Sequence, residues 1–131
     1  MADLKTPANL KYTESDEWLL VEGNTVTIGL TDYAQDALND IVYVELPEDG
    51  EDFDAEDAFG SVESVKAASD LITPIAGTVA AINSELEDEP ELINADPYGK
   101  GWLVKLTVED ADVSGLMDAT AYIAYCEERK A

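Results

Sequence analysis

The sequence predicts an all-β domain, a small sandwich or flattened barrel of antiparallel sheets with short helices at its periphery. Short β-prone segments recur along the chain at near-regular intervals and are separated by turn residues, which is the pattern of small all-β domains. Helix signals occur only between the second and third of these segments and at the C-terminus. No linker or low-complexity tract divides the chain, so we expect one domain over residues 1–131, with residues 1–10 as a flexible N-terminus.

Turn residues indicate how the strands connect. Gly23-Asn24 is a two-residue hairpin signal. Lys66-Ala67-Ala68 forms a tight connection between two β-prone runs, and Gly77 permits a turn into the next strand. The segments predicted as strands are Glu17–Glu22, Thr25–Leu30, Ile41–Leu46, Phe59–Val65, Asp70–Ile75, Thr78–Ile82 and Trp102–Val108.

Two helices are expected. The first ends at Leu38, with Thr31 or Asp32 as its N-cap. Gln35 is placed to complete a capping interaction with Asp32 across the first turn. The second begins near Asp118, and one apolar face is predicted from the spacing of Ala121, Tyr122, Ala124 and Tyr125. Ser84–Pro97 is acidic, contains two prolines and is expected to be a polar loop.

Charge narrows the partners. The net charge is -23, from 30 acidic and 7 basic residues. Such a surface repels phosphate backbones and anionic lipid headgroups, so neither nucleic acid nor a membrane is an expected partner. No apolar run is long enough to span a bilayer and no secretory signal is evident, so we expect a cytoplasmic protein. The alternative is an organelle protein whose transit peptide has been removed. Like charges at this density oppose compactness unless salt screens them, which suggests a salty cytoplasm.

Several catalytic and metal-binding classes lack their residues. The chain has no histidine and one cysteine, so the commonest general base and a zinc ligand set are missing. The phosphate-binding glycine motifs and GxSxG are absent. The acidic run Glu85–Glu91 lacks the spacing of a calcium loop and is expected to be a solvated face. A hydrolase that uses carboxylates alone stays as an alternative, although no paired acid and base at fixed spacing supports it.

Lys66 is the candidate functional residue. It is one of six lysines and lies at a predicted hairpin tip, followed by the small residues Ala67, Ala68 and Ser69. An acylating enzyme needs a protruding lysine whose neutral amine attacks an activated acid. A rigid turn also fixes where the attached group is presented, which raises its effective concentration at a partner. From position alone, an ordinary solvated turn lysine is the simpler interpretation.

The surrounding residues favour the functional interpretation. Residues 60–70 read GSVESVKAASD, and ESVKA followed by SD resembles the lipoyl-attachment segment of glycine cleavage H proteins, with Lys66 at the modified position. Biotin carriers instead place methionines around their lysine, and acyltransferase lipoyl domains usually have Asp before theirs. The resemblance continues in order over nearly the whole chain after about Lys11. Its other segments are Glu17-Trp18, Gly29–Leu38, Asp40–Gly50, Ile93–Trp102 and Tyr122–Glu127.

The resemblance implies a lipoyl/biotinyl-type flattened barrel of two small antiparallel sheets, and a carrier without catalytic activity of its own. Lipoate would be bound covalently to Lys66. Glu63 resembles the residue that helps the lipoate-attaching enzyme select its lysine; the alternative is a strand carboxylate facing water. Ser15, Glu17 and Asp70 match the positions that dock the arm in the family, although in so acidic a chain the two carboxylates are also plausible as ordinary surface acids.

The resemblance also implies partners. The carrier would take the aminomethyl group of glycine from glycine decarboxylase (P protein) to the aminomethyltransferase (T protein). Dihydrolipoamide dehydrogenase (L protein) would then reoxidise the dithiol. The alternative within the same fold is an H-like relay protein that donates lipoyl groups to other complexes. A purified chain with hydrolytic activity alone would instead favour the carboxylate hydrolase.

Two positions depart from the family pattern. Asp16 stands where the family commonly has His before the Glu-Trp pair, which removes a titratable group near the expected docking cleft. Asn39 stands where Gly is usual, and Asn tolerates the left-handed backbone that Gly would supply. Residues expected in the core rather than in a ligand site are Trp18, Tyr43, Phe59, Trp102 and Cys126.

Overall fold

The computed structural model describes residues 6–109, 113 and 115–130. Its strands are β1 (Lys11–Tyr12), β2 (Glu17–Glu22), β3 (Thr25–Leu30), β4 (Ile41–Glu45), β5 (Asp52–Phe53), β6 (Ala58–Ser64), β7 (Ala68–Ile72), β8 (Gly77–Ile82) and β9 (Val104–Thr107). The helices are α1 (Asp32–Leu38), α2 (Glu85–Asp88), α3 (Leu92–Ala95) and α4 (Ala119–Lys130). The prediction of a mostly β fold with short peripheral helices is confirmed, and every segment predicted as a strand overlaps an observed one.

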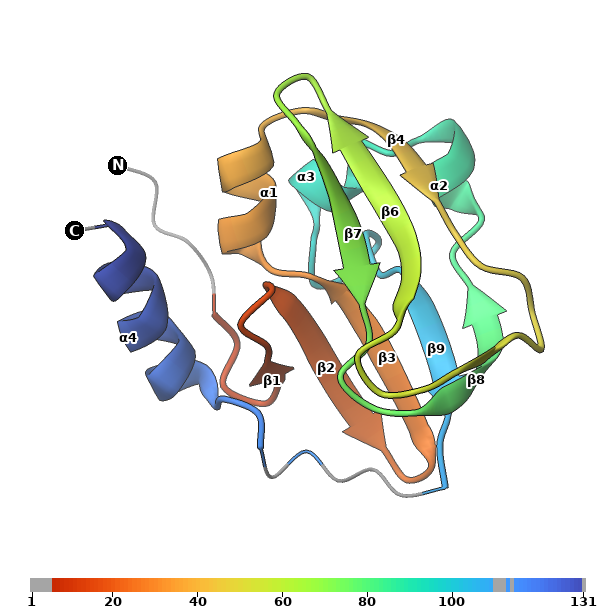
Figure 1. The fold of residues 1–131 in the computed structure, drawn as a ribbon. Coiled ribbons are helices and arrows are strands. Elements are labelled where there is room, and N and C mark those ends of the chain that lie inside the picture. The colour runs from red at the N-terminus through yellow and green to blue at the C-terminus, as the bar shows by residue number, and fades with distance from the viewer. Residues whose placement is uncertain (1–5, 110–112, 114, 131) are drawn as a thin grey trace.

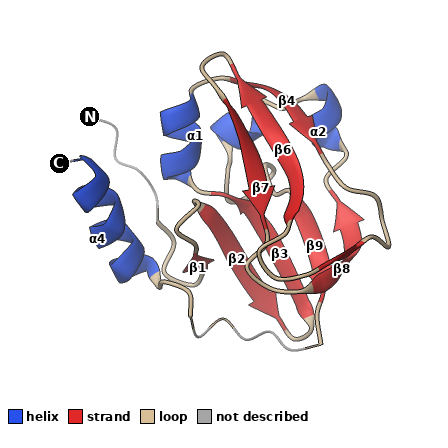
Figure 2. Ribbon diagram, in the orientation of Figure 1, coloured by secondary structure: helices blue, strands red, loops and turns tan. Residues whose placement is uncertain are grey.

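Two antiparallel sheets pack on each other (Figures 1 and 2). The larger has six strands in the order β1-β2-β3-β9-β8-β5, and the smaller has three in the order β4-β6-β7. Glu22 pairs with Thr25 across the predicted two-residue turn, where Gly23 adopts a φ of +63°. In Figure 1 the β6–β7 hairpin lies in front of the larger sheet and extends beyond it at its tip.

The core lies between the sheets. Strand alternation directs one face of each strand inward, so Val44, Val62 and Leu71 of the smaller sheet join Ile28 and Leu106 of the larger one in a single buried cluster. At about 25 cal/mol per Å² of buried apolar surface, this cluster is the main source of stability. Trp18 and Phe59 are buried as predicted.

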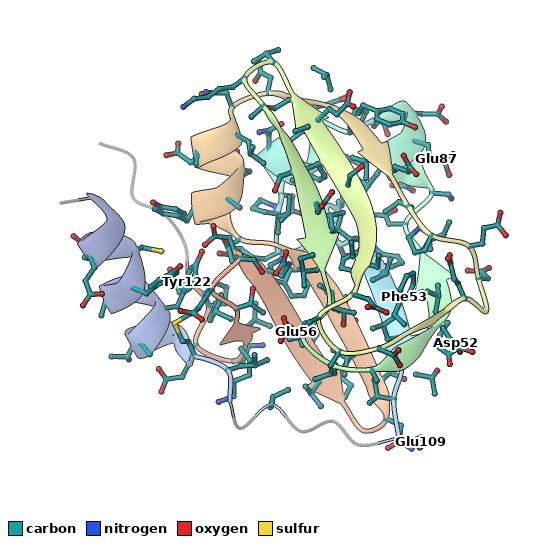
Figure 3. The ribbon with its side chains drawn as sticks, viewed as in Figure 1. Asp52, Phe53, Glu56, Glu87, Glu109 and Tyr122 are labelled. Carbon is teal, nitrogen blue, oxygen red and sulfur yellow. The ribbon has the colours of Figure 1, made fainter. Side chains whose placement is uncertain are left out.

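A second, smaller cluster attaches the C-terminal helix to the edge of the larger sheet. Tyr122 of α4 stacks on Tyr12 of β1 with ring centroids 4.7 Å apart (Figure 3), and Cys126 is buried beside them, as predicted. The predicted apolar face of α4 is confirmed for Tyr122 and Tyr125, which belong to this cluster, and was wrong for Ala121 and Ala124, which are exposed. Cys126, one helical turn after Tyr122, completes the contact.

The acidic stretch expected as a loop contains two one-turn helices, α2 and α3, so that expectation was wrong. Leu86 of α2 and Ile93 of α3 are both fully buried, while the carboxylates around them stay exposed. A single helical turn inserts one apolar side chain into the core and leaves its neighbours in solvent. The apolar residues are too sparse in this stretch to show a helical period in the sequence.

Two aromatic residues and one glycine differ from expectation. Tyr43 is 50% exposed, because the β4–β6 register shifts at Val42 and turns both side chains outward. Trp102 is only partly buried, with Lys105 Nζ lying 5.3 Å from the centroid of its ring. Gly77 is a strand residue rather than a turn residue; an added Cβ would lie 3.0 Å from the Thr107 carbonyl oxygen.

Residues 1–10 were expected to form a flexible N-terminus, and residues 1–5 of this segment lie outside the described part of the chain. Among the others, Leu10 is buried in the α4 cluster, and Tyr12 donates a hydrogen bond of 2.5 Å to the Pro7 carbonyl. Among the described helices, none combines the length and the apolar character needed to cross a bilayer.

Candidate functional site

Lys66 lies at the tip of the β6–β7 hairpin, where the sequence placed it. The two strands pair antiparallel up to Glu63 and Ala68, and residues 65–67 make the connection. The lysine side chain is exposed, and the residues that follow it are small. The structure therefore presents one amine at the end of a paired, and so geometrically fixed, segment.

Ser64 shapes the turn that carries this lysine. Its Oγ accepts hydrogen bonds from Lys66 N at 3.1 Å and Ala67 N at 3.0 Å. Its own N–H donates to the Ala67 carbonyl at 2.8 Å. Sequence reasoning missed this role. The signal was a serine two residues before the lysine, since Ser hydroxyls stabilise turns by bonding to backbone N–H groups two or three residues further along the chain.

The C-terminal end of α1 supports the tip from below. Lys66 Nζ lies 3.4 Å from the Ala37 carbonyl oxygen, one of the last in the helix. Val65 N–H donates to the Asp40 carbonyl at 3.1 Å. The position of α1 therefore helps to set the position of the hairpin tip.

Asn94 of α3 connects this helix end to β4 and was also missed. Its Nδ2 donates to Gln35 Oε1 at 2.9 Å and to the Asn39 carbonyl at 2.8 Å, and its Oδ1 accepts from Ile41 N at 2.8 Å. One amide thus satisfies three polar groups from α1, the loop after it and β4. No local pattern around Asn94 reveals such a long-range role.

Glu63 faces solvent on the outer side of the smaller sheet. It pairs with Tyr43 of β4 on one side and Ala68 of β7 on the other, and it is exposed. Directly paired residues share one face of a sheet. Glu63 is therefore on the same end of the hairpin as Lys66 and is open to contact by another protein.

Glu17 is fully buried and held by three donors. Its Oε1 accepts from Thr13 Oγ1 at 2.6 Å and Ser15 Oγ at 2.5 Å, and its Oε2 accepts from Ile72 N of β7 at 3.2 Å. Burial raises the pKa of the Glu17 carboxyl above its ordinary value, the nearby Asp16 charge adds to the rise, and the three hydrogen bonds oppose it.

The three residues expected to dock the arm are not all in one place. Ser15 and Glu17 line a cleft of about 660 Å³ together with Ile72 and with Glu56, which is labelled in Figure 3. Asp70 lines a different cleft, of about 850 Å³, on the outer side of β7. Ser15 is exposed and its hydroxyl donates to the buried Glu17, so Ser15 offers a hydroxyl group to the space of the first cleft.

Comparison with known proteins decides the family. The sequence model of the glycine cleavage H-protein family matches residues 10–129. The chain is 55% identical to the glycine cleavage system H protein of Chromohalobacter salexigens over 120 residues, which cover 90% of this chain and 92% of the relative. It is 47% identical to the mitochondrial glycine cleavage system H protein 2 of Arabidopsis thaliana, covering 94% and 80% of the two chains.

The chain belongs to the glycine cleavage H-protein family. Its fold agrees with that of a glycine cleavage system H protein from Mycobacterium marinum, with a TM-score of 0.83 at 35% sequence identity over 95% of this chain and 99% of the other. Family membership makes it a lipoyl-carrying component of the glycine cleavage system.

The two departures from the H-protein pattern have different structural consequences. Asp16 adopts a φ of +72° and accepts a hydrogen bond from Tyr122 Oη at 2.8 Å, so this carboxylate helps to hold α4. Asn39 adopts φ +65° and ψ -150°, which is not the left-handed conformation that Asn was expected to tolerate but a region open almost only to Gly, so that expectation was wrong. Within the described residues, no group of acidic, cysteine or histidine side chains is arranged to hold a metal ion.

Proposed function

We propose that lipoate is attached as an amide to Nζ of Lys66, and that the chain carries the aminomethyl group of glycine between the enzymes of the cleavage system. The observation that carries the proposal is the placement of Lys66. It is exposed at the tip of an antiparallel hairpin whose strands pair without interruption from Gly60 to Glu63, in the segment that resembles the family's attachment site. It is also the only lysine or arginine between positions 12 and 99.

Attachment requires one covalent step. The Lys66 amine, in its neutral form, attacks the carbonyl carbon of an activated lipoyl donor, either a mixed anhydride with a nucleotide or a thioester. An amide bond forms, the nucleotide phosphate or the thiol leaves with its bonding electrons, and the amine loses its proton to the leaving group or to solvent. No oxidant is involved. The contact between Nζ and the Ala37 carbonyl is broken as the amine turns toward the donor.

The surroundings of Lys66 fit a tethered arm. When bound, a lipoyl group would supply a disulfide that takes up a one-carbon amine on one sulfur, and passing that unit on would leave the attached group as a dithiol. The free edge of β7 leads from Ala68, beside the lysine, to Ile72, beside Glu17. At about 3.3 Å per residue this strand spans about 13 Å, a length that an extended lipoyl-lysine arm can follow.

The cleft at Ser15 is the docking position we propose for the loaded arm. Thr13 and Ser15 each direct a hydroxyl proton to Glu17. Thr13 Oγ1 also accepts from Glu17 N, so it is the exposed Ser15 hydroxyl whose oxygen keeps lone pairs for a group in the cleft. An ionised carboxylate accepts about four hydrogen bonds, and Glu17 makes three. The cluster therefore suits a protonated amine, which Ser15 would contact and the Glu17 charge would stabilise. Asp70 would contact the arm closer to Lys66, part of the way along β7.

The partners follow from the shuttle. We propose glycine decarboxylase, the aminomethyltransferase and dihydrolipoamide dehydrogenase as the enzymes that use the arm, a lipoate-attaching enzyme that selects Lys66 with the help of Glu63, and the cytoplasm as the compartment. Catalytic groups would be supplied by these enzymes. This chain's contribution is position: a fixed hairpin, an accessible amine and a cleft that limits the arm's exposure to water.

Reconstitution tests the function. The lipoylated chain mixed with the three enzymes, glycine, tetrahydrofolate and NAD should release carbon dioxide and ammonia. Lys66→Arg keeps the charge but offers no acylatable amine, and it should fold, stay unlipoylated and support no turnover. Lys100→Arg is the matched control at another exposed lysine and should behave as the parent. Turnover by Lys66→Arg would refute the proposal; transfer of lipoyl groups to other proteins without glycine cleavage would favour the relay function.

Arm docking has a separate test. Amide spectra of the unmodified, lipoylated and glycine-loaded chain are compared by NMR. Loading should shift the amides of Ser15 and Ile72, and Ser15→Ala should abolish those shifts without changing lipoylation. Glu48→Gln, at an exposed carboxylate far along the chain, is the control. Equal spectra before and after loading would show that the arm does not occupy this cleft.

A further inference from the structure

Three apolar side chains are exposed beside Lys66. Val65 is 69% exposed, Val42 53% and Tyr43 50%; the remaining large hydrophobic residue with comparable exposure in the described part of the chain is Ile123 on α4, at 48%. A single exposed apolar residue is ordinary on a protein surface, whereas a contiguous group indicates a binding surface.

Sheet pairing places these residues on one surface. Tyr43 pairs with Glu63, so the two side chains lie next to each other on the outer face. Val65 is two residues beyond Glu63, and its N–H bonds to the Asp40 carbonyl just before β4. Val42 is the bulged residue between Ile41 and Tyr43. The apolar surface of Val42, Tyr43 and Val65 therefore lies along the β4 side of the hairpin, close to its tip.

The bulge at Val42 is what exposes two successive apolar residues. In a regular strand neighbouring side chains face opposite sides, and one of Val42 and Tyr43 would be buried. Here Ile41 and Val44 on either side are buried while both residues between them face solvent. The core already has its inward residues from β4, so this irregularity serves the outer surface rather than the core.

Carboxylates border the apolar surface. Glu63 is exposed within it, and Glu45 and Glu87 line a cleft of about 490 Å³ that begins at Tyr43. Figure 3 shows Glu87 on α2 beside β4. No lysine or arginine other than Lys66 occurs between positions 12 and 99. A partner complementary to this surface therefore has an apolar patch bordered by cationic side chains.

We propose that Val42, Tyr43 and Val65, with Glu45, Glu63 and Glu87, form the surface bound by the enzyme that acylates Lys66. This inference rests on the proposed lipoylation of Lys66. An acylating enzyme must bring its activated donor to Nζ itself, so it covers the residues that surround the lysine. Enzymes that act on the far end of a flexible arm reach it without covering the tip of the hairpin. The apolar surface lies beside the tip, which identifies the acylating enzyme as its partner.

Steady-state lipoylation of purified unmodified chain tests the surface. Val42→Thr combined with Tyr43→Ser keeps strand-compatible side chains and should raise the KM of the acylating enzyme about tenfold or more. Ile123→Ser, at an equally exposed apolar residue on α4, should leave it unchanged. Glu45→Gln with Glu87→Gln should raise KM less and reduce its dependence on potassium chloride. Glu127→Gln with Glu128→Gln on α4 is the matched control.

Two further measurements make the result specific. Acetylation of Lys66 by a small activated ester should proceed at the parental rate in the Val42→Thr, Tyr43→Ser variant, since the lysine itself is unaltered. Once fully lipoylated, the variant should support glycine cleavage as the parent does. A KM equal to that of Ile123→Ser, a loss in the small-ester reaction, or normal lipoylation with impaired cleavage would each overturn the inference. Failure of the parent chain to be lipoylated at all would instead overturn the proposed function.

Discussion

The tip of the β6–β7 hairpin and the Glu17 cluster use hydrogen bonds in opposite ways. At the tip, Ser64 holds the backbone of the turn while the Lys66 side chain stays exposed. In the cluster, Thr13, Ser15 and Ile72 hold a side chain that is completely buried. A fixed backbone with an exposed side chain suits a group that other enzymes must reach. A fixed and buried carboxylate suits the rigid lining of a cleft.

This difference separates function from stability. Substitutions of exposed side chains at the tip should change recognition with little effect on the free energy of unfolding. Substitutions in the Glu17 cluster should lower that free energy, because they leave buried polar groups without partners.

Glu17→Leu should lower the free energy of unfolding by about 2–3 kcal/mol, because the Ile72 N–H and the Thr13 hydroxyl lose a buried acceptor. Lys66→Arg at the tip should change it by less than about 0.5 kcal/mol. Urea unfolding followed by Trp fluorescence measures both. Equal losses for the two variants would break the distinction between the regions.

Glu17 should also make stability depend on pH. The pKa of this carboxyl is raised by burial above its ordinary value of 4.5, so the folded chain binds the proton more tightly than the unfolded chain. As pH rises from about 4.5 through the raised pKa, the folded state therefore loses stability relative to the unfolded state. The stability difference between the parent and Glu17→Gln should fall over that window.

The glutamine variant is the proper reference for this pH effect. One amide oxygen can accept from Ile72 N while the amide NH₂ donates to the hydroxyls, so packing is kept and only the titration is removed. Other carboxylates titrate equally in both proteins. A difference that stays constant from pH 4.5 to 8, or rises, would show that Glu17 is ionised without cost.

Asn39→Gly should stabilise the fold by about 1 kcal/mol, because φ +65° and ψ -150° is a region open mainly to glycine. The Asn39 side chain is exposed, and the hydrogen bond from Asn94 goes to its backbone carbonyl. Thermal unfolding measures the gain. A fall in melting temperature would mean that the asparagine side chain contributes an interaction that outweighs the backbone cost.

Added salt should raise the melting temperature modestly. With a net charge of -23 on 131 residues, many like charges lie within about 10 Å, the Debye length at 0.1 M salt. Potassium chloride screens their repulsion and favours the compact state. Melting is followed from low to high potassium chloride at constant pH, and an unchanged or falling temperature would contradict the expectation.

The parts of the fold that were predictable depend on neighbouring residues. Each of three confirmed features joins residues only a few positions apart in sequence. They are the Gly23-Asn24 turn, the Thr31 N-cap with its bond from Ala34 N, and the bond from Gln35 to Asp32. Lys66 at a hairpin tip was predictable for the same reason, since small residues and flanking β-prone runs mark it locally.

The parts that were missed depend on distant contacts. The three hydrogen bonds of Asn94 join segments more than 50 residues apart in sequence. Tyr43 was expected in the core because it is aromatic, and no local pattern indicates the bulge that turns it outward. The burial of Glu17 requires β7 to supply the Ile72 N–H, a pairing that no local pattern encodes.

The central claim is that Lys66 alone carries the lipoyl group, and peptide mapping by mass spectrometry tests it most directly. The chain is incubated with lipoate, ATP and a lipoate-attaching enzyme, or is purified from cells fed lipoate, and is then digested with a protease that cleaves at acidic residues. We predict a mass increase of one lipoyl group, less the water lost on amide formation, on the peptide that contains Lys66 and on no other. An unmodified Lys66, or a lipoyl group on Lys100 or Lys105 instead, would contradict the account.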